Sequence, residues 1–193
     1  MSKIETTINI KITPNTIERA KKIRLMIFDV DGVLTDGRLF FGDDGQEYKA
    51  FHSKDGLGMK MLMNSGVEIA IITARKSELV KHRMDNLGIH RLYQGQSNKV
   101  PALLDIATEM KLSLEEIAYI GDDIIDLPVM VRVGLAIAVA DSHNSLFKHA
   151  HWVTKNKGGC GAAREACDMI MEAQNTLQPF IDKSIDTGSN IAN

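Results

Sequence analysis

Short apolar runs alternate along the chain with stretches whose apolar residues recur every three or four positions. Runs of the first kind are typical of buried strands, and the spacing of the second kind indicates amphipathic helices. Strands are expected at Arg24–Val30, Val67–Thr73, Ile117–Gly121 and Leu135–Val139, and in shorter runs at Arg91–Tyr93 and His151–Thr154. Helices are expected at Pro14–Lys22, Leu57–Asn64, Ser77–Leu87, Val100–Met110, Asp126–Val133 and Ala162–Asn175.

This alternation of strands and helices predicts an α/β fold with a doubly wound, parallel, Rossmann-like sheet. One segment breaks the alternation: two extended runs, Arg38–Gly42 and Gln46–His52, are joined by Asp43-Asp44-Gly45, which is a strong hairpin signal. We expect residues 38–52 to form a β-hairpin flap that leans over the end of the first strand. The segments between the next strands are too short to hold a separate cap domain, so the fold is expected to lack one.

Length and composition fit a single globular domain. We assign residues 1–177 to this domain and expect the polar residues 178–193 to form a mobile tail. Hydrophobic residues make up 44% of the chain and charged residues 25%, and the net charge of −2 indicates neither a nucleic-acid nor a membrane partner. No apolar run is long enough to span a bilayer, and the start of the chain does not resemble a secretory signal. With only two cysteines, the protein is expected to work in a reducing cytoplasm.

Two carboxylates directly follow the first expected strand. Asp29 and Asp31 come after the apolar run Leu25–Phe28, and Gly32 lets the backbone turn away from the strand. Open α/β sheets bind ligands in the crevice beyond the carboxyl ends of their strands. Two like charges so close together are costly unless a partner neutralises them, and oxygen ligands favour a hard cation such as Mg²⁺. Taken alone, these residues also fit a solvated Asp-Gly turn.

Later strands also end in reactive side chains. Thr73 closes the second strand, and Lys99 opens a helix. Gly121-Asp122-Asp123 closes another strand, and Asp126 follows one helical turn later. Each residue alone has an ordinary explanation, such as a strand end, a solvated helix start or an N-capping aspartate. Because the carboxyl ends of parallel strands share one edge, we expect these groups to meet in one crevice.

Such a set of groups suits phosphoryl transfer. This chemistry needs an in-line nucleophile, a metal ion, donors around the equatorial oxygens and an acid for the leaving group. The Asp29 carboxylate can attack phosphorus and carry the phosphoryl group as an aspartyl-phosphate. Thr73 and the backbone N–H groups after it can donate to the phosphoryl oxygens, Lys99 can neutralise them, and Asp122 can complete the Mg²⁺ shell.

These motifs resemble those of the haloacid-dehalogenase-like hydrolases. The resembling elements are Asp29-x-Asp31-Gly32-x-x-x-Asp36, Thr73 after an apolar strand, Lys99, and Gly121-Asp122-Asp123-x-x-Asp126. The resemblance implies that Asp29 is the nucleophile and that Asp31 is the general acid and later the base. It further implies that Asp29, the backbone carbonyl of Asp31 and Asp122 bind Mg²⁺. Thr73, Lys99 and Asp126 complete the implied catalytic set, with Asp126 positioning Lys99 or the metal shell.

Nearly the whole chain resembles the capless subgroup of 3-deoxy-D-manno-octulosonate 8-phosphate phosphatases. The run Gly158–Glu165 is specific to this subgroup. The resemblance implies a phosphorylated sugar-acid substrate of lipopolysaccharide synthesis and a homotetramer whose hairpins and neighbouring subunits wall the open site. In this subgroup a C-terminal tail can enter a neighbour's site, and we expect Asp186–Ser189 to do so. The implied substrate-binding residues are Asp31, His52, Ser53, Lys54, Asp55, Gly56, Arg75, Arg83 and Lys99.

The chain departs from the subgroup at two positions. Lys54 stands where arginine is more usual, and it keeps the charge but loses the bidentate fork. Ala74 stands where glycine is usual, and it still offers its backbone N–H. Arg75 and Arg83 are eight positions apart, so we expect both to face the crevice from one helix, although Arg83 also fits a solvated helix face.

Other functions are weighed against this interpretation. A phospho-accepting signalling receiver also combines acids, threonine and lysine around Mg²⁺. In a receiver the acidic pair comes first along the chain, whereas here the Asp-x-Asp motif comes first and the acidic pair comes last. This order favours a hydrolase. An inert assembly domain is disfavoured because every catalytic position is intact. A phosphatase for another 2-keto-3-deoxy sugar phosphate, such as a nonulosonate 9-phosphate, stays open because several subunits would supply the binding contacts.

Overall fold

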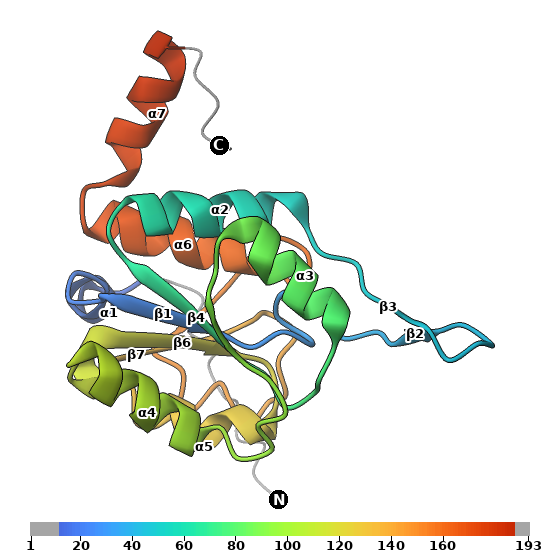
Figure 1. Ribbon diagram of the computed structural model, residues 1–193. Coiled ribbons are helices and arrows are strands. Elements are labelled where there is room, and N and C mark those ends of the chain that lie inside the picture. Colours follow the sequence, from blue (N-terminus) through green and yellow to red (C-terminus); the bar gives the residue numbers. More distant parts are fainter. Residues whose placement is uncertain (1–11, 188–193) are drawn as a thin grey trace, which may run out of the picture.

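The computed structural model describes residues 12–187, and its centre is a sheet of six parallel strands in the order β5-β4-β1-β6-β7-β8 (Figure 1). The doubly wound α/β fold predicted from the sequence is confirmed, including its two shortest strands. The strands are β1 Leu25–Phe28, β4 Glu68–Ile72, β5 Arg91–Tyr93, β6 Ile117–Gly121, β7 Leu135–Ala138 and β8 Trp152–Val153.

Helices cover both faces of this sheet, because successive side chains of a strand point to opposite sides. Met26 and Phe28 of β1 belong to one apolar core, whereas Leu25 and Ile27 belong to the other. Within residues 12–187, no helix combines the length and the apolar composition needed to cross a membrane. Packed on the first core are α1 Pro14–Ala20, α2 Ser53–Asn64, α3 Glu78–Leu87 and α6 Ala162–Ala173, and on the second core α4 Val100–Met110 and α5 Leu127–Met130.

The strand order reverses direction beside β1. The chain runs outward from β1 to β4 and β5, and then returns to β6 on the other side of β1. Phe28 at the end of β1 is in register with Ile71 of β4 and Ile120 of β6, so the residues that follow these strands emerge at one edge. This is the topological switch point at which open α/β sheets form their ligand crevice.

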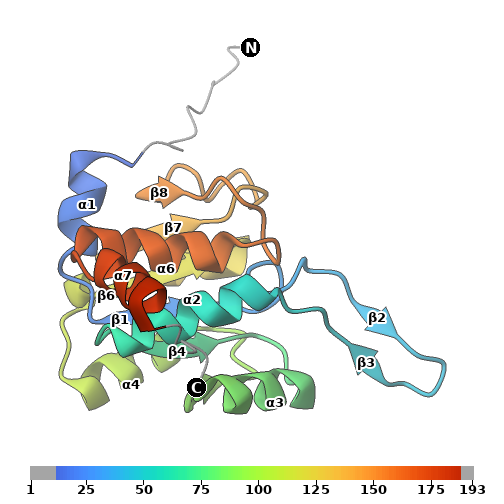
Figure 2. The ribbon, with the colours of Figure 1, turned by 90° about the horizontal axis from the view of Figure 1, so that it is seen from above.

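The predicted hairpin is present and projects from the body of the molecule (Figure 2). Its strands are β2 Phe40–Phe41 and β3 Glu47–Tyr48, which pair antiparallel. Phe40, Phe41 and Tyr48 are 50%, 62% and 55% exposed, so the hairpin presents aromatic side chains to its surroundings. Residues 12–187 contain no cap domain, as the sequence predicted.

Helix α2 begins at Ser53 rather than at Leu57, where the sequence predicted its start. The additional turn contains Gly56, and glycine ordinarily disfavours a helix. In this turn Asp55 is buried, and its Oδ1 accepts from the backbone N–H of Arg164 on α6 at 2.8 Å. Contact between the two helices therefore outweighs the local preference of the sequence.

The C-terminal stretch also differs from its prediction. Residues Leu177–Thr187 form helix α7, which extends away from the end of α6 in Figure 1. The sequence predicted a polar, mobile tail from residue 178 onward, whereas this part of the chain is helical and Phe180 packs against the first core. Ile181 and Ile185, one turn apart, are 41% and 75% exposed. Residues 188–193, which include part of the predicted lid, lie outside the described residues.

Candidate active site

The loop after β1 brings the Asp-x-Asp motif against the end of β6. Asp29 is buried, with 4% of its surface exposed, and Asp31 is half-buried. Gly32 has a φ of +89°, and a Cβ there would lie 2.1 Å from Oδ2 of Asp122. Glycine is therefore required at this position, both for the backbone conformation and for the close approach of the two acidic loops.

Three carboxylates meet at this edge: ligand atoms of Asp29, Asp122 and Asp126 all lie within 4.8 Å of one another. Burial and the charge of Asp126 raise the pKa of Asp29 from 3.8 to about 7, although Lys99 acts in the opposite direction. Burial and the charges of Asp29 and Asp126 raise the pKa of Asp122 to about 8. The positive charge of Lys99 therefore does not fully balance the negative charges of the three carboxylates.

The hydrogen bonds separate the roles of the three acids. Asp126 is fully buried, and its Oδ2 accepts from the backbone N–H groups of Asp122 (2.9 Å) and Asp123 (3.1 Å). Its Oδ1 accepts from Lys99 and Tyr119. No hydrogen-bond donor among residues 12–187 reaches the carboxylate of Asp122. Asp29 and Asp122 thus fit a hard divalent cation with oxygen ligands, and Asp126 orients the groups around them.

Lys99 is the cation of this cluster. It stands at the N-cap position of α4 and is 1% exposed. Its Nζ lies 2.9 Å from Oδ1 of Asp29, 2.7 Å from Oδ1 of Asp126 and 3.1 Å from the Tyr119 hydroxyl. Burial opposes the charge, but Asp29 and Asp126 outweigh it and raise the pKa of Lys99. The side chain therefore stays an ammonium ion beside the expected nucleophile.

Thr73 lies directly after β4, at the same edge as Asp29, and is 2% exposed. The loop that follows is fixed to it, because the Gln96 backbone N–H donates to the Thr73 carbonyl at 3.0 Å. No hydrogen bond from the Thr73 hydroxyl to the described residues is present. The hydroxyl is therefore free to donate to a bound phosphoryl oxygen.

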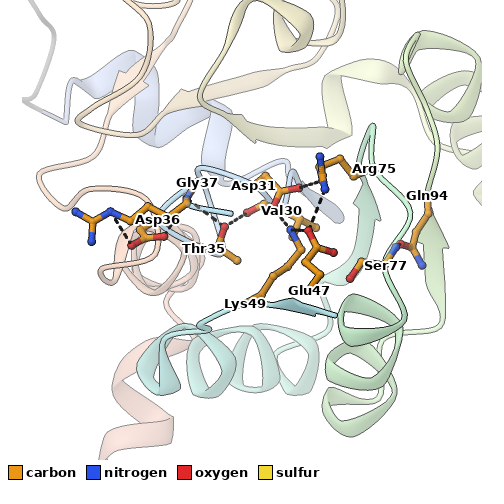
Figure 3. A network of polar contacts seen from close by, with 11 residues as sticks. Val30, Asp31, Thr35, Asp36, Gly37, Glu47, Lys49, Arg75, Ser77 and Gln94 are labelled. Carbon is orange, nitrogen blue, oxygen red and sulfur yellow. Dashed lines mark hydrogen bonds and ion pairs between the residues drawn. The ribbon is translucent and has the colours of Figure 1, made fainter. Parts of the chain in front are cut away.

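Asp31 belongs to a separate ionic network with the hairpin (Figure 3). The Lys49 ammonium donates to Oδ1 of Asp31 and lies 3.3 Å from Glu47. Arg75 pairs with Glu47 at 3.0 Å and lies 3.9 Å from Oδ2 of Asp31. Burial acts to raise the pKa of Glu47, but Lys49 and Arg75 outweigh burial and lower this pKa. Glu47 and Lys49, at the base of the hairpin, thus place charged groups next to Asp31, the expected general acid.

Other sequence-predicted substrate contacts lie around the start of α2. Ser53 and Lys54 are exposed, and His52 and Lys54 line a cavity of about 900 Å³. Asp55 is 2% exposed, and its Oδ1 accepts from the backbone N–H of Arg164, so it joins α2 to α6 within one subunit. Gly56 is also buried and lies beside Arg83.

The two arginines do not share a helix, so that expectation is wrong. Helix α3 begins at Glu78, and Arg75 lies in the loop before it, where it reaches Asp31 and Glu47. Arg83 is on α3, and its guanidinium lies over the ring of Phe51, 5.8 Å from the centroid. The turn before α3 arises because the chain must leave the edge of β4 before a helix can pack on the sheet face.

The glycine-rich run Gly158–Glu165 supports the catalytic loop from behind. A Cβ on Gly158 would lie 1.7 Å from the Gly32 carbonyl oxygen, and Gly159 donates to the Val33 carbonyl at 2.9 Å. The Gly158 N–H also donates to Asp141 at 3.0 Å. Close backbone contact with residues 32–36 accounts for Gly158 and Gly159, whereas Gly161 has a φ of +103°.

Comparison with known proteins places the chain in a family. The model of the haloacid dehalogenase-like hydrolases matches residues 88–164. The chain is 48% identical over 174 residues to the 3-deoxy-D-manno-octulosonate 8-phosphate phosphatase of Yersinia pestis, and the match covers 90% of this chain and 93% of the relative. The chain belongs to this phosphatase family. A second member, from Escherichia coli K12, is likewise 48% identical over 90% of this chain and 93% of its own length.

Solved structures of the phosphatase family share the fold. The Y. pestis phosphatase superimposes with a TM-score of 0.86 at 48% identity, over 86% of this chain and 90% of that one. The phosphatase of Moraxella catarrhalis, solved in complex with magnesium, phosphate and KDO, superimposes with a TM-score of 0.87 at 38% identity. That match covers 89% of this chain and 99% of the relative.

Sequence reasoning missed three residues that the structure places at the site. Lys49 and Glu47 contact the Asp31 network, and Tyr119 contacts Lys99 and Asp126. For the hairpin pair a signal was present, because Glu47 and Lys49 alternate with Tyr48 and therefore share one face of the strand. For Tyr119 the signal was masked, because an aromatic residue inside an apolar strand ordinarily indicates core packing.

Proposed function

We propose that the protein is a Mg²⁺-dependent phosphatase that hydrolyses 3-deoxy-D-manno-octulosonate 8-phosphate to the free sugar acid and phosphate. The observation that carries this proposal is the cluster of Asp29, Asp122, Asp126 and Lys99 at the sheet's switch point. Membership of the phosphatase family supports the choice of substrate. We place the reaction in lipopolysaccharide synthesis, in the cytoplasm.

Asp29 is the nucleophile in the proposed reaction. One carboxylate oxygen of Asp29 bonds to phosphorus, and the bond from phosphorus to the sugar oxygen breaks. Asp31 gives its proton to the departing sugar oxygen and then accepts a proton from the water that attacks the aspartyl-phosphate. Phosphate leaves, and the Asp29 carboxylate is restored.

The remaining residues bind and orient the phosphoryl group. When bound, Mg²⁺ supplies positive charge that offsets the phosphoryl oxygens and the acids around it. Asp29, the Asp31 carbonyl and Asp122 are the proposed ligands. Thr73 donates to a phosphoryl oxygen, and Lys99 balances the developing charge. Asp126 is not proposed as a ligand, because both of its carboxylate oxygens already accept hydrogen bonds; its role is to orient Lys99.

We further propose that substrate binding is shared within a homotetramer. The crevice lacks a cap, while the exposed aromatic residues of the hairpin, Phe40, Phe41 and Tyr48, offer an apolar surface that a second subunit can cover. Arg75 and Lys99 approach the phosphate end of the substrate, and the proposed sugar-acid contacts are His52, Ser53, Lys54, Asp55, Gly56 and Arg83. The segment around Asp186–Ser189 is proposed to act as a lid on a neighbouring site.

The decisive experiment replaces the nucleophile. Asp29→Asn should abolish turnover of the octulosonate phosphate and keep the fold, since asparagine has the same shape. Chelation of Mg²⁺ should likewise stop the native protein. A phosphate-release panel that includes a nonulosonate 9-phosphate tests the sugar length. Turnover by Asp29→Asn, or activity that survives a chelator, would falsify the mechanism, and preference for the nonulosonate would reassign the substrate.

A further inference from the structure

Behind the cluster of acids lies a buried hydroxyl that the proposed reaction does not use. Tyr119 is on β6 and is 0% exposed, with its ring packed in the second core. Its hydroxyl lies 2.5 Å from Oδ1 of Asp126 and 3.1 Å from Nζ of Lys99. A phenol placed between a carboxylate and an ammonium ion is a specific polar arrangement, whereas phenylalanine would fill the same core volume.

The directions of these hydrogen bonds follow from chemistry. An ionised carboxylate only accepts, so the Tyr119 hydroxyl donates its one proton to Asp126. An ammonium only donates, so the Tyr119 oxygen accepts from Lys99. Asp126 in turn is fixed by the backbone N–H groups of Asp122 and Asp123. Tyr119 and Asp126 therefore form a rigid pair of acceptors for Lys99.

The donors of Lys99 are then fully accounted for. An ammonium has three N–H bonds, and Nζ has three acceptors within hydrogen-bond distance: Asp126, Tyr119 and Asp29. Two of these acceptors lie behind the site, and the third is the proposed nucleophile. Only the bond toward Asp29 faces the position where a phosphoryl group would lie.

We propose that Tyr119 is a positioning residue: with Asp126 it holds two N–H bonds of Lys99 and thereby directs the third toward Asp29 and the transferred phosphoryl group. This inference rests on the proposed phosphatase function. Without the hydroxyl, Lys99 keeps Asp126 and Asp29 as partners but loses one of its two fixed acceptors, so one of its three donors is unused. The charge of Lys99 would remain, but its N–H groups would be held less firmly in direction.

The test is Tyr119→Phe, which keeps the ring in the core and leaves Asp126 Oδ1 bonded to Lys99. Hydrogen bonds to charged groups contribute enough that we expect kcat to fall about tenfold or more with p-nitrophenyl phosphate. Affinity for orthovanadate, measured calorimetrically at saturating Mg²⁺, should weaken by a similar factor. Affinity for Mg²⁺ alone should stay within about twofold, because neither proposed carboxylate ligand has lost a hydrogen bond.

The matched control is Tyr93→Phe, which removes a phenol hydroxyl from β5, where it makes no hydrogen bond within the described chain. This control should behave as the native protein does. If Tyr119→Phe also retains native kcat and orthovanadate affinity, or only lowers the melting temperature, the inference is wrong. Failure of the proposed function looks different, because the native protein itself would then show no Mg²⁺-dependent hydrolysis.

Discussion

The acidic cluster predicts that Mg²⁺ stabilises the protein more strongly as the pH rises. Asp29 has a pKa of about 7 in the folded, metal-free protein instead of 3.8. An acid whose pKa is raised by folding holds its proton longer in the folded state. The free energy of unfolding therefore falls as the pH rises from about 4 toward about 7. Asp122, with a pKa of about 8, acts in the same direction.

The magnitude follows from the shift of Asp29. About three pKa units correspond to roughly 4 kcal/mol, which the metal-free protein loses across this pH range. The contribution of Asp122 is not added, because the two acids repel each other and share part of the effect. For a protein of this size, roughly 4 kcal/mol corresponds to a change in melting temperature on the order of 10 °C.

Differential scanning calorimetry at several pH values, with saturating Mg²⁺ or with EDTA, measures the effect. Mg²⁺ binding requires ionised carboxylates and should offset their repulsion, so the rise in melting temperature should be small near about pH 5 and largest near about pH 8. Burial and Arg19 lower the pKa of His151, which has the opposite effect on stability. Comparing both arms at each pH cancels this contribution.

Two variants sharpen the measurement. Asp122→Asn removes one titrating acid and one proposed ligand, so its metal-free form should lose the part of the pH dependence that comes from Asp122. The part from Asp29 should remain, because burial and Asp126 cause it, and Mg²⁺ should stabilise this variant little. Asp105→Asn, at an exposed position on α4, is the matched control and should behave as the native protein does. A Mg²⁺-induced shift as large at about pH 5 as at about pH 8 would refute the reasoning.

Three further outcomes are expected. Lys49→Met should lower kcat about tenfold, because Asp31 loses its closest counter-charge, whereas Lys81→Met, from an exposed pair, should change nothing. Light scattering should give about four times 21.3 kDa, and a fully active monomer would contradict the shared site. Deleting residues 186–193 keeps Phe180 on the core, so the melting temperature should not change. The kcat or KM for the sugar phosphate should change. If the deletion variant has native kinetics with both this substrate and p-nitrophenyl phosphate, the tail has no role in catalysis.

The sheet and the acidic edge were predictable because their signals are local. Each strand is a short apolar run, and the residue after each run is placed at the sheet edge by the geometry of parallel strands. Asp29, Thr73 and Asp122 therefore meet once the fold class is known. Lys99 was found for the same reason, since it opens the helix after a strand that ends at this edge.

The remaining features depend on contacts between distant segments. The early start of α2 depends on the contact of Asp55 with α6, and the place of Arg75 depends on where α3 docks. The partners of Asp31 come from the hairpin, whose strands have two residues each and little periodicity to interpret. Helix α7 did have a signal, since Leu177, Ile181 and Ile185 recur every four positions, but the polar residues between them masked it.

The register of the hairpin carries a consequence for insertions and deletions. Phe40 pairs with Tyr48 and Phe41 with Glu47, which sets Glu47 and Lys49 on the face that reaches Asp31. A length change in the turn that slips β3 by one residue would exchange these charges for the ring of Tyr48. A slip of two residues would leave the same set of side chains on the face toward Asp31, because side chains alternate between the two faces of a strand. Tolerance to length variation at the hairpin tip should therefore alternate between odd and even changes, although the tip itself never touches the acid.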